Sequence, residues 1–134
     1  MGKKIDRSGF TLIELMVVIL IVGILAAVAV PLMRGRIDSA KWSEGKAIMC
    51  TIATELRAYC AEKDDAGTWP PSLTNLGFVA GDLTGTYFVD TDFTWLNATY
   101  SSLANPSLTY TIIATHATLN PGQVELTHLG GWTP

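Results

Sequence analysis

Hydrophobic residues fill one continuous stretch near the start of the chain. Residues 10–30, FTLIELMVVILIVGILAAVAV, contain a single charged side chain, Glu14. As an α-helix this stretch would be about 31 Å long, close to the roughly 30 Å thickness of the hydrocarbon core of a bilayer. The pattern therefore predicts a membrane-spanning helix in these residues.

Beyond residue 30 the pattern becomes that of an amphipathic helix. Charged residues alternate there with apolar residues that recur mainly at steps of three and four, as on one face of a helix. The apolar stripe consists of Ile37, Ile48, Ile52, Leu56 and Tyr59. We expect one helix from about Phe10 to Lys63, with its second half packed on the remainder of the chain.

Gly23 and Pro31 are the expected weak points of this helix. Proline lacks an N–H group and clashes with the preceding turn, and glycine is a weak helix former. We expect a kink or a local opening of the helix between these two residues. A mild bend is the alternative.

Short β-like runs separated by turn residues follow the helix. One face of the third run should be buried, because apolar residues alternate there mainly with threonines. The residues Asn120-Pro121-Gly122 are typical of a turn between the last two runs. The predicted fold class is α+β: a long N-terminal helix, transmembrane in its first half and amphipathic in its second, packed on a small antiparallel β-sheet. The predicted strands are 87–89, 93–100, 108–118 and 124–128.

Charge is distributed unequally along the chain. The 134 residues include 9 Lys or Arg and 12 Asp or Glu, for a net charge of −3. Every Lys and Arg lies at or before Lys63, and only acidic residues carry formal charge after it. Because an acidic surface repels phosphate backbones, we expect no direct nucleic-acid binding by the head, residues 31–134.

Glu14 is a charged residue in a predicted membrane-spanning helix, where charged residues are unexpected. A charged side chain within a spanning helix is costly, and it is a functional candidate by default. Cleavage between Gly9 and Phe10 would create an amine one helical turn from Glu14. In a packed bundle, the amine of one copy could then pair with Glu14 of its neighbour.

Two other interpretations of the N-terminus remain open. Residues 1–9, MGKKIDRSG, are basic and favour a cytoplasmic N-terminus, although Arg34 and Arg36 weaken that argument. An ordinary secretory signal could be cut near residues 27–29, but such signals keep their apolar segment free of charge. A permanent membrane anchor is the second alternative.

The block Gly9-Phe10-Thr11-Leu12-Ile13-Glu14, between a short basic leader and an apolar helix that ends at Pro31, resembles the type IV prepilin signature. The resemblance implies that a membrane-embedded prepilin peptidase removes the leader, residues 1–9, by cutting after Gly9. The same enzyme would N-methylate Phe10, and Glu14 would help to dock an incoming subunit. Residues 10–30 would become the filament core.

The resemblance also implies a structural subunit and not an enzyme. The precursor would be a single-pass protein of the bacterial inner membrane, and the mature chain would join a periplasmic or cell-surface filament. Its partners would be other copies in a helical homopolymer, the peptidase and methyltransferase, and an inner-membrane assembly platform with its ATPase. The head would be periplasmic or extracellular and would have the ladle-like pilin fold.

Several functions fit this resemblance. One is a type IV pilus subunit, and another is the major pseudopilin of a type II secretion system. The absence of a C-terminal cysteine pair favours the pseudopilin, whereas the absence of an evident calcium loop disfavours it. A membrane-anchored binding module that never polymerises is the rival from another class.

The head offers little candidate chemistry. Asp82, Asp90 and Asp92 could supply oxygen ligands to calcium, although no cofactor is required. His116 and His128 could be cross-strand neighbours across the predicted turn, but no third metal ligand is adjacent. No spacing typical of a catalytic triad or a phosphate-binding loop is present.

The two cysteines, Cys50 and Cys60, lie in the predicted helix. Ten residues of helix separate them by about 15 Å, and a disulfide needs Cα atoms within roughly 7 Å. They should therefore not pair with each other within one chain. Packing in the core and pairing between subunits both remain open.

Overall fold

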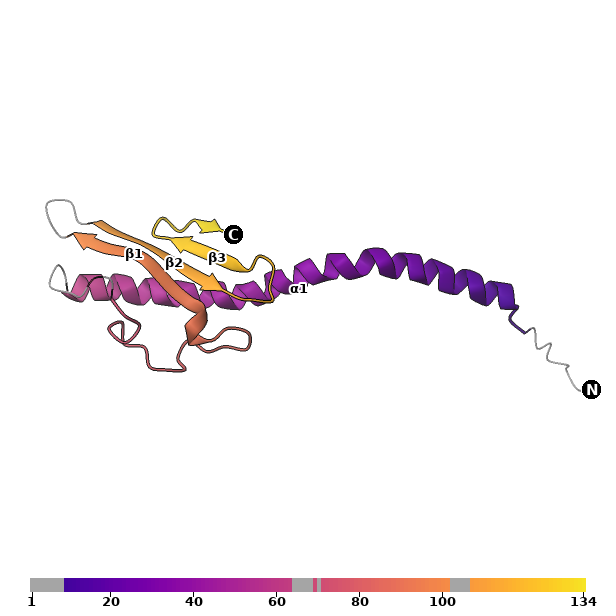
Figure 1. Cartoon of the computed structure of the whole chain (residues 1–134), viewed down its shortest axis with the longest axis horizontal. Coiled ribbons are helices and arrows are strands. Elements are labelled where there is room, and N and C mark those ends of the chain that lie inside the picture. Colours follow the sequence, from indigo (N-terminus) through magenta and orange to yellow (C-terminus); the bar gives the residue numbers. More distant parts are fainter. Residues whose placement is uncertain (1–8, 64–68, 70, 102–106) are drawn as a thin grey trace, which may run out of the picture. The chain divides into compact units, whose positions relative to one another are not determined.

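The computed structural model describes residues 9–63, 69, 71–101 and 107–134. One long helix, α1 (Leu12–Lys63), precedes a 3₁₀ turn, η2 (Asp90–Asp92), and four strands, as Figure 1 shows. The chain divides into two compact units at Arg36 and Ile37. The strands are β1 (Phe93–Ser101), β2 (Ser107–Thr115), β3 (Gln123–Thr127) and β4 (Trp132–Thr133).

The helix ends at Lys63, as the sequence predicts, and it begins at Leu12. It passes through Gly23 and Pro31 without interruption, so the expected local opening is absent from this single chain. A proline removes only one hydrogen bond of a helix, and its neighbours can keep the helical conformation. A role for these residues in filament flexibility stays a prediction.

The four strands form one antiparallel sheet in the order β1-β2-β3-β4. The last three predicted strands are confirmed with small shifts at their ends, but the first, 87–89, is wrong. That segment pairs with no strand among the described residues and leads directly into η2. The two-residue strand β4 was too short to leave a periodic pattern, so the sequence did not reveal it.

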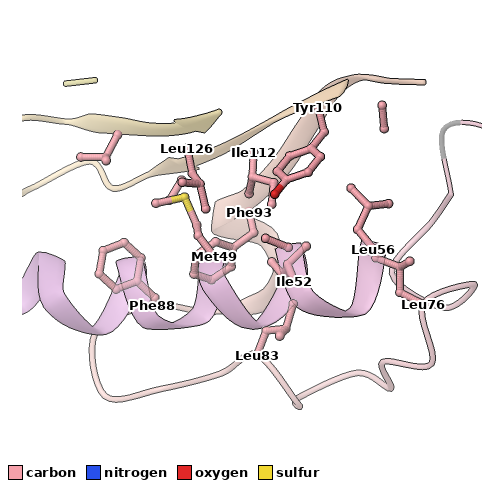
Figure 2. Close-up of a cluster of buried hydrophobic side chains, with 14 of the residues drawn as sticks. Met49, Ile52, Leu56, Leu76, Leu83, Phe88, Phe93, Tyr110, Ile112 and Leu126 are labelled. Atoms are coloured by element: carbon pink, nitrogen blue, oxygen red, sulfur yellow. The ribbon is translucent and has the colours of Figure 1, made fainter. Parts of the chain in front are cut away.

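The hydrophobic core lies between the sheet and the second half of α1, as Figure 2 shows. Ile52 and Leu56 are buried as predicted, but Ile37 is 48% exposed and does not belong to the core. The centre of the buried face is shifted by about one residue, because Trp42 and Met49 are buried in the core. The sheet contributes the predicted alternating residues of β2: Leu108, Tyr110, Ile112 and Ala114.

Phe88 joins the segment before the sheet to α1. Its ring is fully buried and lies against Gly45, where an added Cβ would come within 2.8 Å of the ring. The Glu44 carboxylate on the same helix accepts the backbone N–H groups of Tyr87 and Phe88 at 2.8 and 3.2 Å. These contacts hold residues 87–89 on the helix, which explains why they do not form a strand.

Asp90 organises the loop that precedes η2. Its carboxylate accepts the N–H groups of Gly81 and Leu83 and the hydroxyl of Thr84. The Gly81 hydrogen bond is the main cause that lowers the pKa of Asp90 below its ordinary value, and the bonds from Thr84 and Leu83 act in the same direction. The ionised carboxylate therefore stabilises this loop.

Gly45→Ala should destabilise the fold because the new methyl group would collide with the buried Phe88 ring. We expect a loss of about 1–3 kcal/mol in the free energy of unfolding, although alanine is the better helix former. Urea unfolding of the full chain in detergent measures it. Gly35→Ala is the matched control, because a Cβ there meets nothing within 4 Å. Equal stability of the two variants would contradict this packing.

Asp90→Asn should weaken the fold at neutral pH and much less in acid. A carboxyl whose folded-state pKa is depressed stabilises the fold above its unfolded pKa, and this contribution is lost as the pH falls through the folded pKa. Because the pKa of Asp90 is lowered, the wild type should approach the variant below about pH 4. Urea midpoints of both chains at pH 7 and pH 3 test this. A pH-independent difference would count against an ionic role.

Candidate functional site

The start of α1 contains a capping box that joins Thr11 and Glu14. Glu14 Oε2 accepts the backbone N–H of Thr11 at 2.8 Å and the Thr11 hydroxyl at 2.6 Å. The Glu14 N–H in turn lies 3.3 Å from Thr11 Oγ1. Such reciprocal bonds satisfy backbone donors that the first turn of a helix leaves open. The helix therefore begins at Leu12, immediately after its capping residue.

This local role of Glu14 was not among the expectations from the sequence. The signal was present, since threonine followed three residues later by glutamate before an apolar run is typical of a helix N-terminus. The positive end of the helix dipole also favours a carboxylate at this position. Glu14 is thus stabilised within its own chain, before any partner binds.

The carboxylate keeps one oxygen for a further interaction. Oε1 of Glu14 has no hydrogen-bond partner among residues 9–63 or elsewhere in the described chain. The whole side chain is exposed at the end of the helix. An ammonium group from a second molecule could therefore reach Oε1 while Oε2 still caps the helix.

The apolar part of α1 is exposed all round. Residues 9–36 are all exposed, and Phe10 and Leu12 are 89% and 77% exposed. By length and composition alone, α1 is able to cross a membrane. A soluble monomer rarely exposes so large a contiguous apolar surface, which marks it as a site for lipid or for other proteins.

Gly9 and Phe10, the predicted cleavage site, lie just before α1. Both residues are exposed and outside regular secondary structure. A peptidase needs to draw an extended segment into its active site, so the Gly9–Phe10 bond is placed where it can be reached without unwinding the helix. The leader residues 1–8 lie outside the described part of the chain.

The predicted histidine pair is wrong. β2 and β3 pair Thr115 with Gln123 and Thr111 with Thr127. His116 therefore lies beside the turn, where its N–H donates to Gly122, whereas the N–H of His128 donates to Tyr110. The two histidines lie near opposite ends of the strand pair, because the turn is centred nearer to Leu119 than to Pro121-Gly122.

The three candidate calcium ligands each bond to their own loop. Asp82 accepts the N–H of Val79 and Asp92 accepts that of Val89, while Asp90 holds the segment around Gly81. Within the ranges that the structure describes, no group of three His, Cys, Asp or Glu residues is arranged to hold a metal ion. Calcium binding stays a prediction.

The two cysteines are not joined by a disulfide, as their spacing predicts. Cys60 is buried in the core, but Cys50 is exposed on α1, so the core interpretation is right for one and wrong for the other. Pairing of Cys50 between subunits stays a prediction.

Comparison with known proteins gives an independent assignment of the N-terminal segment. Residues 5–30 match the family described as "Prokaryotic N-terminal methylation motif". The chain is 51% identical over 57 residues to the type II secretion system core protein G of Pseudomonas aeruginosa, covering 42% of this chain and 40% of that protein. No solved structure gives a significant match.

Pilins of other bacteria match at lower identity. The chain is 45% identical over 58 residues to the type IV major pilin protein PilA of Myxococcus xanthus, covering 43% of this chain and 26% of that protein. It is 36% identical over 87 residues to the fimbrial protein EcpC of Eikenella corrodens, covering 65% of this chain and 54% of that protein. The chain spans about half or less of the length of these relatives.

The methylation motif covers the start of the exposed apolar helix, which precedes the small antiparallel sheet. In this N-terminal segment the chain is similar to type IV pilins and type II secretion pseudopilins.

Proposed function

We propose that this chain is the structural subunit of a type IV pilus-like filament. The observation that carries the proposal is the exposed apolar stretch of residues 10–30, whose only charge, Glu14, caps the first turn of α1 with one oxygen and leaves the other open. A surface of this kind suits lipid first and other copies of itself afterwards. A filament subunit that waits in the membrane requires one helix that contacts lipid before assembly and other subunits after it.

Processing precedes assembly in this proposal. The precursor spans the bacterial inner membrane, and prepilin peptidase removes residues 1–9 by cutting after Gly9. The enzyme then N-methylates Phe10. The platform and its ATPase extract the mature chain into the filament, and the apolar helices exchange lipid for one another. The head lies in the periplasm or at the cell surface.

The new amine of Phe10 supplies the partner of Glu14. In a helical stack of subunits, the ammonium of an incoming chain meets the open Oε1 of Glu14 on an adjacent copy. The pair is specific because an unpaired charge in the low-dielectric core would be costly. Each copy offers one ammonium and one carboxylate, so the contact is heterologous and repeats along a filament without closing.

The second candidate is the major pseudopilin of a type II secretion system. The identity of 51% to a secretion core protein G is higher than the identities of 45% and 36% to the two pilins. Both cysteines lie in α1, so the strands carry no disulfide of the kind seen in many pilins. Imaging separates the two: long surface fibres containing this chain would count against a purely secretory role.

The first test is the mass of the mature N-terminus. We expect native protein to begin at Phe10 and to carry one extra methyl group, because the exposed Gly9–Phe10 bond fits the prepilin motif. Peptide mass spectrometry of the membrane fraction and of sheared filaments measures it. A non-polymerising membrane anchor would instead keep Met1, and that result would rule out this use of Gly9.

The second test separates the charge of Glu14 from its capping role. Glu14→Gln retains the capping box, since glutamine also serves at this position, but it removes the charge. We expect Glu14→Gln and Glu14→Ala alike to insert normally in the membrane and to lower filament yield about tenfold or more, as loss of a desolvated charge partner does. Quantification of sheared filaments against total membrane-bound chain measures this.

Thr11→Ala is the matched control for that experiment. It removes the capping hydroxyl that bonds Glu14 but keeps the carboxylate. We expect filaments from this variant. Wild-type yield from Glu14→Gln, together with loss of filaments from Thr11→Ala, would show that helix capping and not charge pairing is what assembly needs.

A further inference from the structure

The C-terminal unit, Ile37–Pro134, contains a hollow with aromatic walls and one cationic group. The hollow has a volume of about 250 Å³ and is lined by Trp42, Lys46, Pro121 and Trp132, among others. The Trp42 indole N–H donates to the Pro121 carbonyl at 2.9 Å, which fixes that wall. Lys46 Nζ lies 5.1 Å from the centre of the Trp132 ring.

Lys46 has no carboxylate partner in the described part of the chain. The only ion pair among those residues joins Lys63 to Glu62 at the far end of α1. Glu125 on β3 instead accepts a hydrogen bond from the Gln123 amide. The hollow therefore offers apolar aromatic surface beside an ammonium group, which suits an apolar side chain with an adjacent carboxylate.

The turn from Val79 to Asp82 presents that combination. Val79 is 71% exposed, although it is apolar, and Asp82 is also exposed. The Asp82 N–H donates to the Val79 carbonyl at 3.1 Å, and Asp82 Oδ2 accepts the Val79 N–H at 2.8 Å. Gly81, at a φ of +99°, allows the tight turn. Asp82 Oδ1 has no hydrogen bond to any residue that the structure describes.

The hollow and the turn belong to different flanks of α1. Lys46 borders the hollow, whereas Glu44 bonds the segment that follows the turn, at Tyr87 and Phe88. Two residues apart on a helix, these side chains point about 200° apart. Figure 1 likewise shows the loop and the strand β4 on either side of the second half of α1. The Val79–Asp82 turn therefore cannot reach the hollow of its own chain.

We propose that the Val79–Asp82 turn of one copy docks in the Trp42–Lys46–Trp132 hollow of the next. Val79 packs between the two tryptophans, and the Asp82 carboxylate pairs with the Lys46 ammonium. Each copy uses a different surface for each neighbour, so the contact repeats in one direction, as a filament requires. This inference rests on the proposed function, because it needs a polymer of this chain.

A charge swap tests the pairing in filaments of the full chain. Lys46→Glu and Asp82→Lys should each lower filament yield about tenfold, because they place like charges together, and the double variant should recover it. Lys46→Glu combined with Glu62→Lys is the matched control. It makes the same two kinds of charge change, but the second lies outside the turn, so the filament yield should not recover. Failure of both single variants to change the yield would overturn the proposed contact.

Cross-linking gives a readout that does not depend on yield. The cross-linking variant carries Cys50→Ser, Ser39→Cys and Val79→Cys in one chain. Ser39 also lines the hollow. Oxidised filaments should then give a ladder of covalent dimers, trimers and longer chains on a denaturing gel. Leu129→Cys in place of Val79→Cys is the control, because Leu129 is 84% exposed but lies outside the turn. It should give no ladder.

The outcomes separate the two proposals. If the wild type forms filaments but the variant with cysteines at Ser39 and Val79 gives no ladder, the docking contact alone is overturned. Cross-links from Ser39→Cys to a different protein, without a ladder, would overturn it as well. A wild-type chain that inserts in the membrane and never polymerises would overturn the proposed function and this contact together.

Discussion

One carboxylate at the start of an apolar helix is the constraint on which the rest of this molecule depends. Residues 10–30 hold no other charge, and their side chains make no core of their own. Glu14 would be costly in such a helix if it were bare. The Thr11 hydroxyl, the Thr11 N–H and the helix dipole stabilise it within the single chain.

The capped carboxylate gives the proposed filament two stages. Before assembly, Oε2 bonds Thr11 and the subunit is stored in the membrane with its charge locally satisfied. On assembly, the open Oε1 takes up an ammonium from another copy, and the apolar helices pack on one another in place of lipid. The directional charge pair selects the register, and van der Waals packing of the helices adds to the contact. The head contact inferred at Lys46 and Asp82 would fix the rotation between neighbours.

The fold and the site differ in how far the sequence reveals them. Periodicity predicted α1 and three of the strands, because apolar spacing directly reflects which face is buried. It misplaced the centre of the helix face, because the predicted stripe did not include Trp42 and Met49, which are buried. It mistook residues 87–89 for a strand, because their burial depends on Gly45 and Glu44, more than forty residues away.

At the candidate site, the roles of Gly9, Phe10 and Glu14 stay predictions, and the sequence analysis did not predict the bonds that Glu14 makes. A local capping box could have been read from Thr11 and Glu14, whereas the histidine pair depended on the centre of a turn that spacing alone does not fix. The hollow beside Lys46 was beyond the sequence altogether. Its walls come from α1, the β2–β3 turn and β4, which only the folded chain brings together.

The most direct measurement is a structure of the assembled filament in which side chains near the mature N-terminus are resolved. We expect the Phe10 ammonium of one copy to lie about 3 Å from a Glu14 oxygen of an adjacent copy, within hydrogen-bond distance. A filament in which every Glu14 contacts only Thr11 of its own chain, with the ammonium of Phe10 elsewhere, would contradict the proposed pairing.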